Sequence, residues 1–130
     1  MLNSDELVLD KIVQFVVKNI PAYQGKQYAI KRLIGMHITF GTFDVMWDKD
    51  GDIMACVRWN ITESGKGCSV LDLVINPKYK FKGFYIMKRL IAKNWVRFPL
   101  VEFIQFKRGI KYPLRGKSLY KIKDLLKKRS

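Results

Sequence analysis

Residues 73–85 read LVINPKYKFKGFY, and this stretch decides the fold that we expect. Its first three residues are large and aliphatic, as in a strand buried on both faces. Pro77 ends the strand, and a short basic loop follows with lysines at 78, 80 and 82. Apolar residues at helical spacing from Phe84 then predict an amphipathic helix that runs to about Trp95. A helix start that carries lysines beside a strand end predicts an anion site.

Positive charge accumulates from this point of the chain onwards. The 130 residues carry a formal net charge of +14. Residues 1–76 hold 8 Lys and Arg against 9 Asp and Glu, whereas residues 77–130 hold 17 against 2. So sharp a step predicts an anionic partner for the C-terminal half, which could be a phosphate ligand, a nucleic acid or an acidic protein.

The spacing of apolar residues predicts helices first and strands afterwards. One helix is expected from Ser4 to Ile20, closed by Pro21, and a second from Gln27 to Met36. His37 is expected as a polar residue between this helix and the first strand. Alternation then predicts strands at 42–47, 53–61 and 100–106, and the nearly continuous apolar run at 68–75 predicts a buried strand. Residues 118–122 could form a final strand, and residues 124–129 a short helical turn or a frayed end. These elements are expected to form a single domain of residues 1–130.

Alternation within two strands also predicts which side chains share a face. In the strand 53–61 the inward residues are expected to be Ile53, Ala55, Val57, Trp59 and Ile61. In the strand 100–106, Val101 and Phe103 are expected on one face, and an edge near Phe103 could pair with a second copy. The protein is therefore expected to be a monomer or a homodimer.

Composition argues against a metalloprotein and a membrane protein. No apolar run reaches the ~18 residues of a membrane helix, and the acidic N-terminus lacks the features of a signal peptide, so a cytoplasmic location is expected. Two cysteines and one histidine predict no metal site, and Cys56 and Cys68 are expected to stay reduced in the core. The acidic turn that starts at Asp48 does not fit a calcium loop, because the sixth and twelfth positions are Ile53 and Trp59.

The stretch 73–85 resembles the cofactor motif of the GNAT (Gcn5-related N-acetyltransferase) superfamily. In that family the fourth strand ends in an L-x-V-x-P-x-Y pattern, and an R/Q-x-x-G-x-G/A loop opens the next helix. The positions that correspond are Leu73, Ile75, Pro77 and Tyr79 for the strand, then Lys80, Gly83 and Tyr85 for the loop. The preceding hairpin and the following strand agree with the family's order, so the resemblance in layout spans about residues 40–108.

The resemblance implies an α+β fold class, a three-layer arrangement of a mixed, mostly antiparallel sheet flanked by helices. It also implies acetyl-CoA as the cofactor and an amine as the acetyl acceptor. It implies that the pantetheine arm pairs with the splayed edge of the strand, around Val74, Ile75 and Asn76. It also implies a pyrophosphate site at the start of the helix, formed by Lys80, Phe81, Lys82, Gly83, Phe84 and Tyr85. Tyr85 stands where the family has glycine or alanine, so its ring either points away or fills that site.

Attack of an amine on a thioester requires a base, a donor to the oxyanion and an acid for the leaving thiolate. The candidates are Asp72 and then Glu102 as the base, the Ile75 N–H as the donor, and Tyr112 or Tyr120 as the acid. Asp72 could instead pair with Arg58 or with a lysine across the sheet.

Two readings without catalysis remain open. The basic C-terminal half could bind nucleic acid, because its cations alternate with aromatic residues. The cations concerned are Lys107, Arg108, Lys111, Arg115 and Lys117. The chain could also be a structural or adaptor protein that has the fold without the cofactor.

Overall fold

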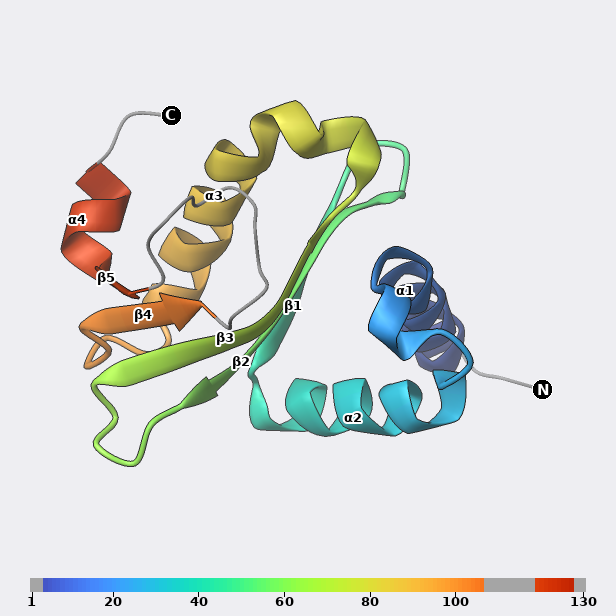
Figure 1. The fold of residues 1–130 in the computed structure, drawn as a ribbon, viewed down its shortest axis with the longest axis horizontal. Coiled ribbons are helices and arrows are strands. Elements are labelled where there is room, and N and C mark those ends of the chain that lie inside the picture. The colour runs from blue at the N-terminus through green and yellow to red at the C-terminus, as the bar shows by residue number, and fades with distance from the viewer. Residues whose placement is uncertain (1–3, 107–118, 128–130) are drawn as a thin grey trace.

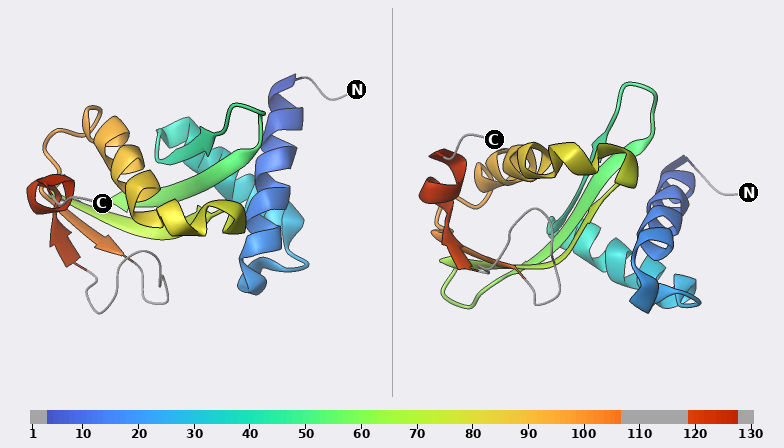
Figure 2. Two further views of the ribbon diagram at one scale, coloured as in Figure 1. Left: turned by 90° about the horizontal axis from the view of Figure 1, so that it is seen from above. Right: turned by 45° about the horizontal axis from the view of Figure 1, so that its top comes forward.

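The computed structural model describes residues 4–106 and 119–127, and its centre is a twisted five-stranded sheet. Helices α1 (Ser4–Asn19) and α2 (Gln27–Phe40) cover one face of the sheet, and α3 (Gly83–Trp95) covers the other (Figure 1). The short helix α4 (Ile122–Lys127) lies on the same side as α3 (Figure 2). The α+β class with three layers, expected from the sequence, is therefore confirmed.

The strands follow one another across the sheet in chain order. They are β1 (Phe43–Trp47), β2 (Ile53–Ile61), β3 (Gly67–Ile75), β4 (Phe103–Phe106) and β5 (Leu119–Lys121). Neighbours are antiparallel except β3 and β4, which are parallel and joined through α3. A parallel pair requires such a crossover, because the chain must return to the starting end of the sheet.

A β-bulge interrupts the pairing of β3 with β2. Trp59 lies opposite Val70, whereas Arg58 lies opposite Asp72, so Leu71 is an extra residue on β3. Such an insertion bends the bulged strand and increases its local twist. The bend falls in the middle of β3, where it affects the pairing with β4.

Each face of the sheet has its own hydrophobic core. The core beside α1 and α2 contains Val16 and Ile34, both 2% exposed, and the buried thiol of Cys56. The core beside α3 and α4 contains Ile86 and Leu125, both fully buried. Two cores explain why β2 is buried along most of its length rather than alternately.

The ends of the helices follow the sequence signals only in part. α2 continues past the expected Met36 to Phe40 and ends at Gly41, whose φ of 75° is the left-handed conformation that glycine adopts without strain. His37 therefore lies in the last turn of α2 and is buried, rather than in a connection. Residues 77–82, expected as a loop, form the 3-10 helix η2 (Pro77–Lys82), which runs directly into α3.

The predicted faces of two strands are wrong at single positions. Ile53 packs in the core beside α1 and α2, because the register of β1 and β2 shifts between Met46 and Trp47. Val101 and Phe103 do not share a face: Val101 is buried and Phe103 is 37% exposed, since the regular strand begins only at Phe103. The edge expected near Phe103 is also absent, because β5 pairs with β4 there.

Strand β1 forms one border of the sheet, and its acidic residue is fully engaged. The Asp44 carboxylate accepts the Val45 N–H at 2.8 Å and the Asn94 side-chain amide at 2.8 Å. It also pairs with Lys93 of α3 at 3.2 Å. These contacts connect the border of the sheet to α3.

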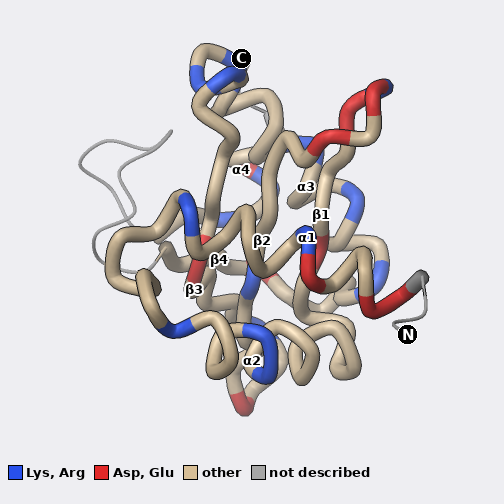
Figure 3. The backbone as a smooth tube through the Cα atoms, turned by 90° about the vertical axis from the view of Figure 1, so that its right-hand side faces the viewer, with Lys and Arg blue, Asp and Glu red and all other residues tan. Residues whose placement is uncertain are grey.

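No helix in the described part of the chain is both long enough and apolar enough to span a membrane. Within the same residues, no cluster of histidine, cysteine and carboxylate side chains could hold a metal ion. Both acidic and basic positions occur along the backbone on the side where α1 and α2 lie (Figure 3), in keeping with the balanced charge of residues 1–76.

Candidate functional site

Among the described residues, the edge of β3 that faces β4 is paired only along its first half. Val70 opposite Phe106 is the last such pair, and no described residue pairs with that edge from Leu71 to Ile75. We call this stretch, which ends where η2 begins, the open edge, or opening, of β3.

The alternation of an antiparallel pair determines which backbone groups face this opening. The Asn76 N–H donates to Met54 O of β2 at 2.8 Å, so Asn76 and Val74 present their N–H and C=O groups to β2. Leu73 and Ile75 consequently present theirs to the open edge. Val74, Ile75 and Asn76 were predicted to pair with a cofactor, and of these only Ile75 has its backbone N–H and C=O groups directed away from β2, towards the open edge.

The N–H groups at the start of η2 are already used within the protein. The Asn76 side chain accepts the Lys78 N–H at 3.1 Å, and the Asn76 carbonyl accepts the Tyr79 N–H at 2.7 Å. The Gly83 N–H donates to Lys80 O. These three N–H groups are therefore not free to bind an anion. The side chains of the three η2 lysines are all exposed and carry positive charge at this point.

Tyr79 holds η2 against the turn between β1 and β2. Its hydroxyl donates to Asp48 Oδ2 at 2.7 Å, and this hydrogen bond, with smaller effects of burial and nearby carboxylates, raises the pKa of Tyr79 to about 12. The same bond lowers the pKa of Asp48. The tyrosine of the predicted motif thus positions the basic segment.

Two aromatic rings lie among the cations at the start of α3. Phe81 is 78% exposed and Tyr85 is 46% exposed. The Arg89 guanidinium lies 5.7 Å from the centre of the Tyr85 ring, and its Nη1 is 3.4 Å from the phenol oxygen. Of the two orientations expected for Tyr85, the structure has the ring pointing away, towards Arg89 on the outer face of α3.

A polar network lies on the opposite face of β3, below α1 and α2. Arg58 Nε donates to Asp72 Oδ2 at 2.7 Å, and the Tyr23 hydroxyl donates to Asp72 Oδ1 at 2.8 Å. Arg58 Nη1 lies 3.3 Å from His37 Nε2, and His37 Nδ1 lies 2.8 Å from Thr42 Oγ1. Asp72 therefore pairs with Arg58, which was the alternative to its role as a base.

Burial sets the protonation of this network. It lowers the pKa of His37, and the Arg58 charge lowers it further, so the imidazole is neutral at pH 7. A neutral ring can accept from Arg58 at Nε2 and donate to Thr42 at Nδ1. Burial, followed by the hydrogen bond to Asp72, raises the pKa of Tyr23, so its phenol stays a donor.

The other predicted catalytic residues are not brought to the opening. The backbone of Glu102 forms hydrogen bonds with the backbones of Lys66 and Ile122. Lys66 precedes Ile75 by nine residues, which is roughly 30 Å at the rise of a strand. Tyr120 is 5% exposed and packs edge-on against Phe106 in the core. Tyr112 lies outside the described residues, as do the predicted nucleic-acid contacts Lys107, Arg108, Lys111, Arg115 and Lys117.

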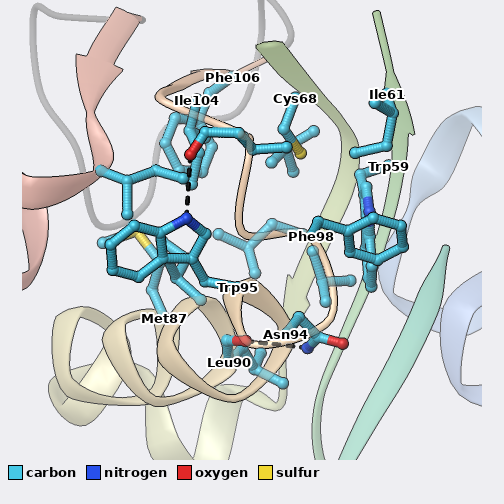
Figure 4. A pocket seen from close by; sticks show the side chains of 16 residues that line it. Trp59, Ile61, Cys68, Met87, Leu90, Asn94, Trp95, Phe98, Ile104 and Phe106 are labelled. Atoms are coloured by element: carbon cyan, nitrogen blue, oxygen red, sulfur yellow. Dashed lines mark hydrogen bonds between the residues drawn. The ribbon is translucent and has the colours of Figure 1, made fainter. Parts of the chain in front are cut away.

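A cavity of about 60 Å³ lies between α3 and the sheet (Figure 4). The rings of Trp59 and Phe98 border one side and that of Trp95 the other, and Cys68 of β3 reaches it from above in this view. At about 24 cal/mol per Å³, a void of this size costs on the order of 1–2 kcal/mol of stability.

The two cysteines allow a matched test of this void. Cys68→Leu adds methyl groups beside the cavity, so we expect the free energy of unfolding to stay constant or rise by up to about 1 kcal/mol. Cys56→Leu adds the same groups beside a space of about 10 Å³ in the other core, so we expect a loss of about 1–3 kcal/mol. Urea denaturation of both variants measures the difference, and equal losses would contradict the cavity.

Solved structures of acetyltransferases share this architecture. Gcn5 from Tetrahymena matches with a TM-score of 0.58 at 9% identity over 83% of this chain and 65% of its own. A chimera of spermidine N-acetyltransferase SpeG from Vibrio cholerae and hSSAT matches with a TM-score of 0.53 at 16% identity, over 75% of this chain and 64% of its own. A GNAT-family protein from Desulfovibrio desulfuricans matches with a TM-score of 0.56 at 12% identity, over 85% of this chain and 72% of its own. The chain has the GNAT fold.

At these identities the likeness establishes the GNAT fold and no more. No protein-family model and no curated protein sequence matches the chain. The chain spans about two thirds of the length of the SpeG chimera and of Gcn5. The GNAT resemblance expected from residues 73–85 is thus confirmed for the fold.

Sequence reasoning missed two members of the polar network. Tyr23 lies 49 residues from Asp72, and nothing in the sequence connects them. His37 was expected outside the helix, although its position three residues after Ile34 places both on one face of α2. Arg58 within an apolar strand was the one available signal, because a buried cation requires a partner.

Proposed function

We propose that this protein is a CoA-dependent N-acyltransferase that acts on an amine. One observation carries the proposal: the backbone of Leu73 and Ile75 faces an edge of β3 with which no described residue pairs, in a fold shared with named N-acetyltransferases. An extended amide-containing ligand can pair with such an edge as an added strand does. The pantetheine arm of acetyl-CoA is a ligand of this kind.

The residues around the opening fit acetyl-CoA in part. The exposed side chains of Lys80 and Lys82 can bind its phosphates, and the Phe81 ring offers an apolar surface beside them. Gly83 does not offer its N–H, which donates to Lys80 O, so the phosphates would be held by side chains more than by backbone. Val74 and Asn76 attach this part of the chain to β2, and Phe84, in the first turn of α3, packs against the core on that side of the sheet.

When bound, the cofactor supplies a thioester, whose carbonyl carbon forms a bond to the amine nitrogen as the carbon–sulfur bond breaks. The Ile75 N–H is placed to donate to the carbonyl oxygen as it becomes negative. Asp72, three residues earlier on β3, is not kept as the base in this proposal, because its carboxylate is paired with Arg58 and Tyr23 on the opposite face of the strand. No described residue is assigned that role.

Calorimetry with acetyl-CoA tests the proposal. We expect micromolar binding by the wild-type chain and at least tenfold weaker binding by Lys82→Glu, because charge reversal places a carboxylate beside the phosphates. Lys66→Glu makes the same change at an exposed lysine at the far end of β3, and it should shift the affinity less than twofold. No heat at millimolar acetyl-CoA would rule the proposal out.

A further inference from the structure

Residues 77–101, which form η2, α3 and the connection to β4, contain no acidic residue. They hold seven cations, which are Lys78, Lys80, Lys82, Lys88, Arg89, Lys93 and Arg97. Lys93 pairs with Asp44 of β1. Among the described residues, no carboxylate forms an ion pair with Lys80, Lys82 or Arg89. A positive field therefore surrounds this segment and attracts anionic partners.

Two aromatic rings are exposed within this field, and each has a cation against it. Phe81 is 78% exposed, and Lys82 Nζ lies 5.7 Å from the centre of its ring. Tyr85 is 46% exposed, and the Arg89 guanidinium lies 5.7 Å from the centre of its ring. Exposure of apolar rings to water is unfavourable, so solubility alone gives no reason for them to lie among the cations.

The rings and cations follow one another along a single element. Tyr85 and Arg89 lie one turn apart on the outer face of α3, and Arg89 Nη1 donates to the Tyr85 hydroxyl at 3.4 Å. Because η2 runs directly into α3 (Figure 1), Phe81 and Lys82 immediately precede this pair. We call these four residues, together with Lys80, the η2–α3 surface.

The combination of rings and cations indicates the class of anion. A single strand of nucleic acid offers phosphates to the cations and unpaired bases to the rings, and each stacked base adds affinity. An acidic peptide offers carboxylates to the cations and leaves the rings without a partner. In a duplex, the faces of the bases are already stacked on one another. The η2–α3 surface therefore fits a single strand better than either alternative.

Acidic residues border this surface at one end. Tyr79 of η2 binds Asp48 in the turn between β1 and β2, and that turn also contains Asp50 and Asp52. Their carboxylates repel phosphates, so a bound strand is directed away from the turn and along α3.

We propose that the η2–α3 surface binds single-stranded nucleic acid. Phe81 and Tyr85 stack on its bases, and the three cations of the surface contact its phosphates. This binding does not depend on the proposed acyltransferase activity, and it lies on described residues rather than on residues 107–117, where the sequence predicted nucleic-acid contacts. Lys80, Phe81 and Lys82 also border the proposed acetyl-CoA site, so the two ligands exclude each other there.

Fluorescence anisotropy with a labelled polyadenylate of about ten nucleotides tests the proposal. The affinity should fall about 10–20-fold between 50 and 200 mM salt, because three phosphate contacts give a slope of about −2 in log affinity against log salt. Arg89→Glu should weaken binding about tenfold or more at the lower salt concentration. Tyr85→Ser removes one stacked base and should weaken binding about fivefold or more. Both side chains are exposed, so circular dichroism should show both variants folded.

Helix α2 provides a matched pair on the other side of the sheet. The Arg32 guanidinium lies 6.0 Å from the centre of the Tyr28 ring, which is 76% exposed. This pair belongs to the part of the chain with balanced charge. Tyr28→Ser and Arg32→Glu should therefore change the affinity for polyadenylate less than about twofold.

Equal losses in the α2 and α3 variants would overturn the proposal, because they would show attraction to the whole protein rather than to one surface. Polyglutamate that competes as well as polyadenylate would also overturn it, in favour of an acidic protein partner. A duplex that binds as tightly as the single strand, or no binding at the lower salt concentration, would have the same consequence. Arg89→Glu should leave acetyl-CoA binding within about threefold of the wild type, since Arg89 lies outside the proposed acetyl-CoA site. Each proposal can therefore fail without the other.

Discussion

Arg58→Met is expected to lower the free energy of unfolding by about 3 kcal/mol. The side chains of Arg58 and Asp72 are only 8% and 12% exposed, so the substitution leaves a carboxylate out of water with no cation beside it. Loss of one partner of a buried ion pair typically costs about 3–5 kcal/mol, and the slight exposure of Asp72 favours the lower end. His37 also loses its donor at Nε2.

Urea denaturation at pH 7, followed by tryptophan fluorescence, measures this loss. The double variant Arg58→Met with Asp72→Leu should recover most of it, because an apolar pair of similar volume requires no desolvation of charge. Lys31→Met breaks an ion pair of similar length, 2.9 Å, whose side chains are 36% and 32% exposed, and it should destabilise the protein much less than Arg58→Met does. A cost for Arg58→Met as small as that of Lys31→Met would show that the network contributes little to folding.

Ile75→Pro is expected to weaken acetyl-CoA binding at least tenfold in a protein that still folds. The Ile75 N–H faces the open edge, so proline removes a donor that no described strand uses. Proline is tolerated in a strand where its nitrogen faces away from the ladder, and the preceding residue is already extended. The proposed contact to the thioester is then lost without loss of the sheet.

Val74→Pro is the matched control, one residue earlier. Val74 faces Cys56 of β2, so proline there removes a ladder hydrogen bond and should cost about 3 kcal/mol or more of stability. Circular dichroism and calorimetry separate the two outcomes. Ile75→Pro with wild-type affinity would show that the open edge does not bind the cofactor, and unfolding of both variants to the same extent would contradict the assigned directions of the two residues.

The sequence was sufficient for elements that local patterns determine. The turn at Asp48–Gly51 and the alternating strands around it predicted the hairpin of β1 and β2. The apolar run, the basic segment and the helical spacing of residues 73–95 predicted the end of β3 and the helix α3 that follows it. These predictions succeeded because each depends on residues close together in the chain.

Features that depend on distant contacts could not be predicted. η2 is helical because Asn76 binds both β2 and the first turn of η2, and Tyr79 binds Asp48 31 residues away. The phase of β4 differs from the expected one because the chain turns at Phe98–Val101 before the strand begins. The Ile75 N–H points away from β2 because of the register between β2 and β3, and the sequence of one strand does not determine that register.

The contacts of Asp44 also affect how separate molecules meet. Thr42 accepts the Trp59 N–H of β2, so alternation turns the Val45 N–H outward, along the border of the sheet. Unpaired donors on such a border are templates for aggregation into intermolecular sheets. Here the Asp44 carboxylate takes that donor and puts a charge beside it. An incoming strand would therefore meet an occupied donor at Val45 and a carboxylate beside it, which disfavours pairing at this point of the border.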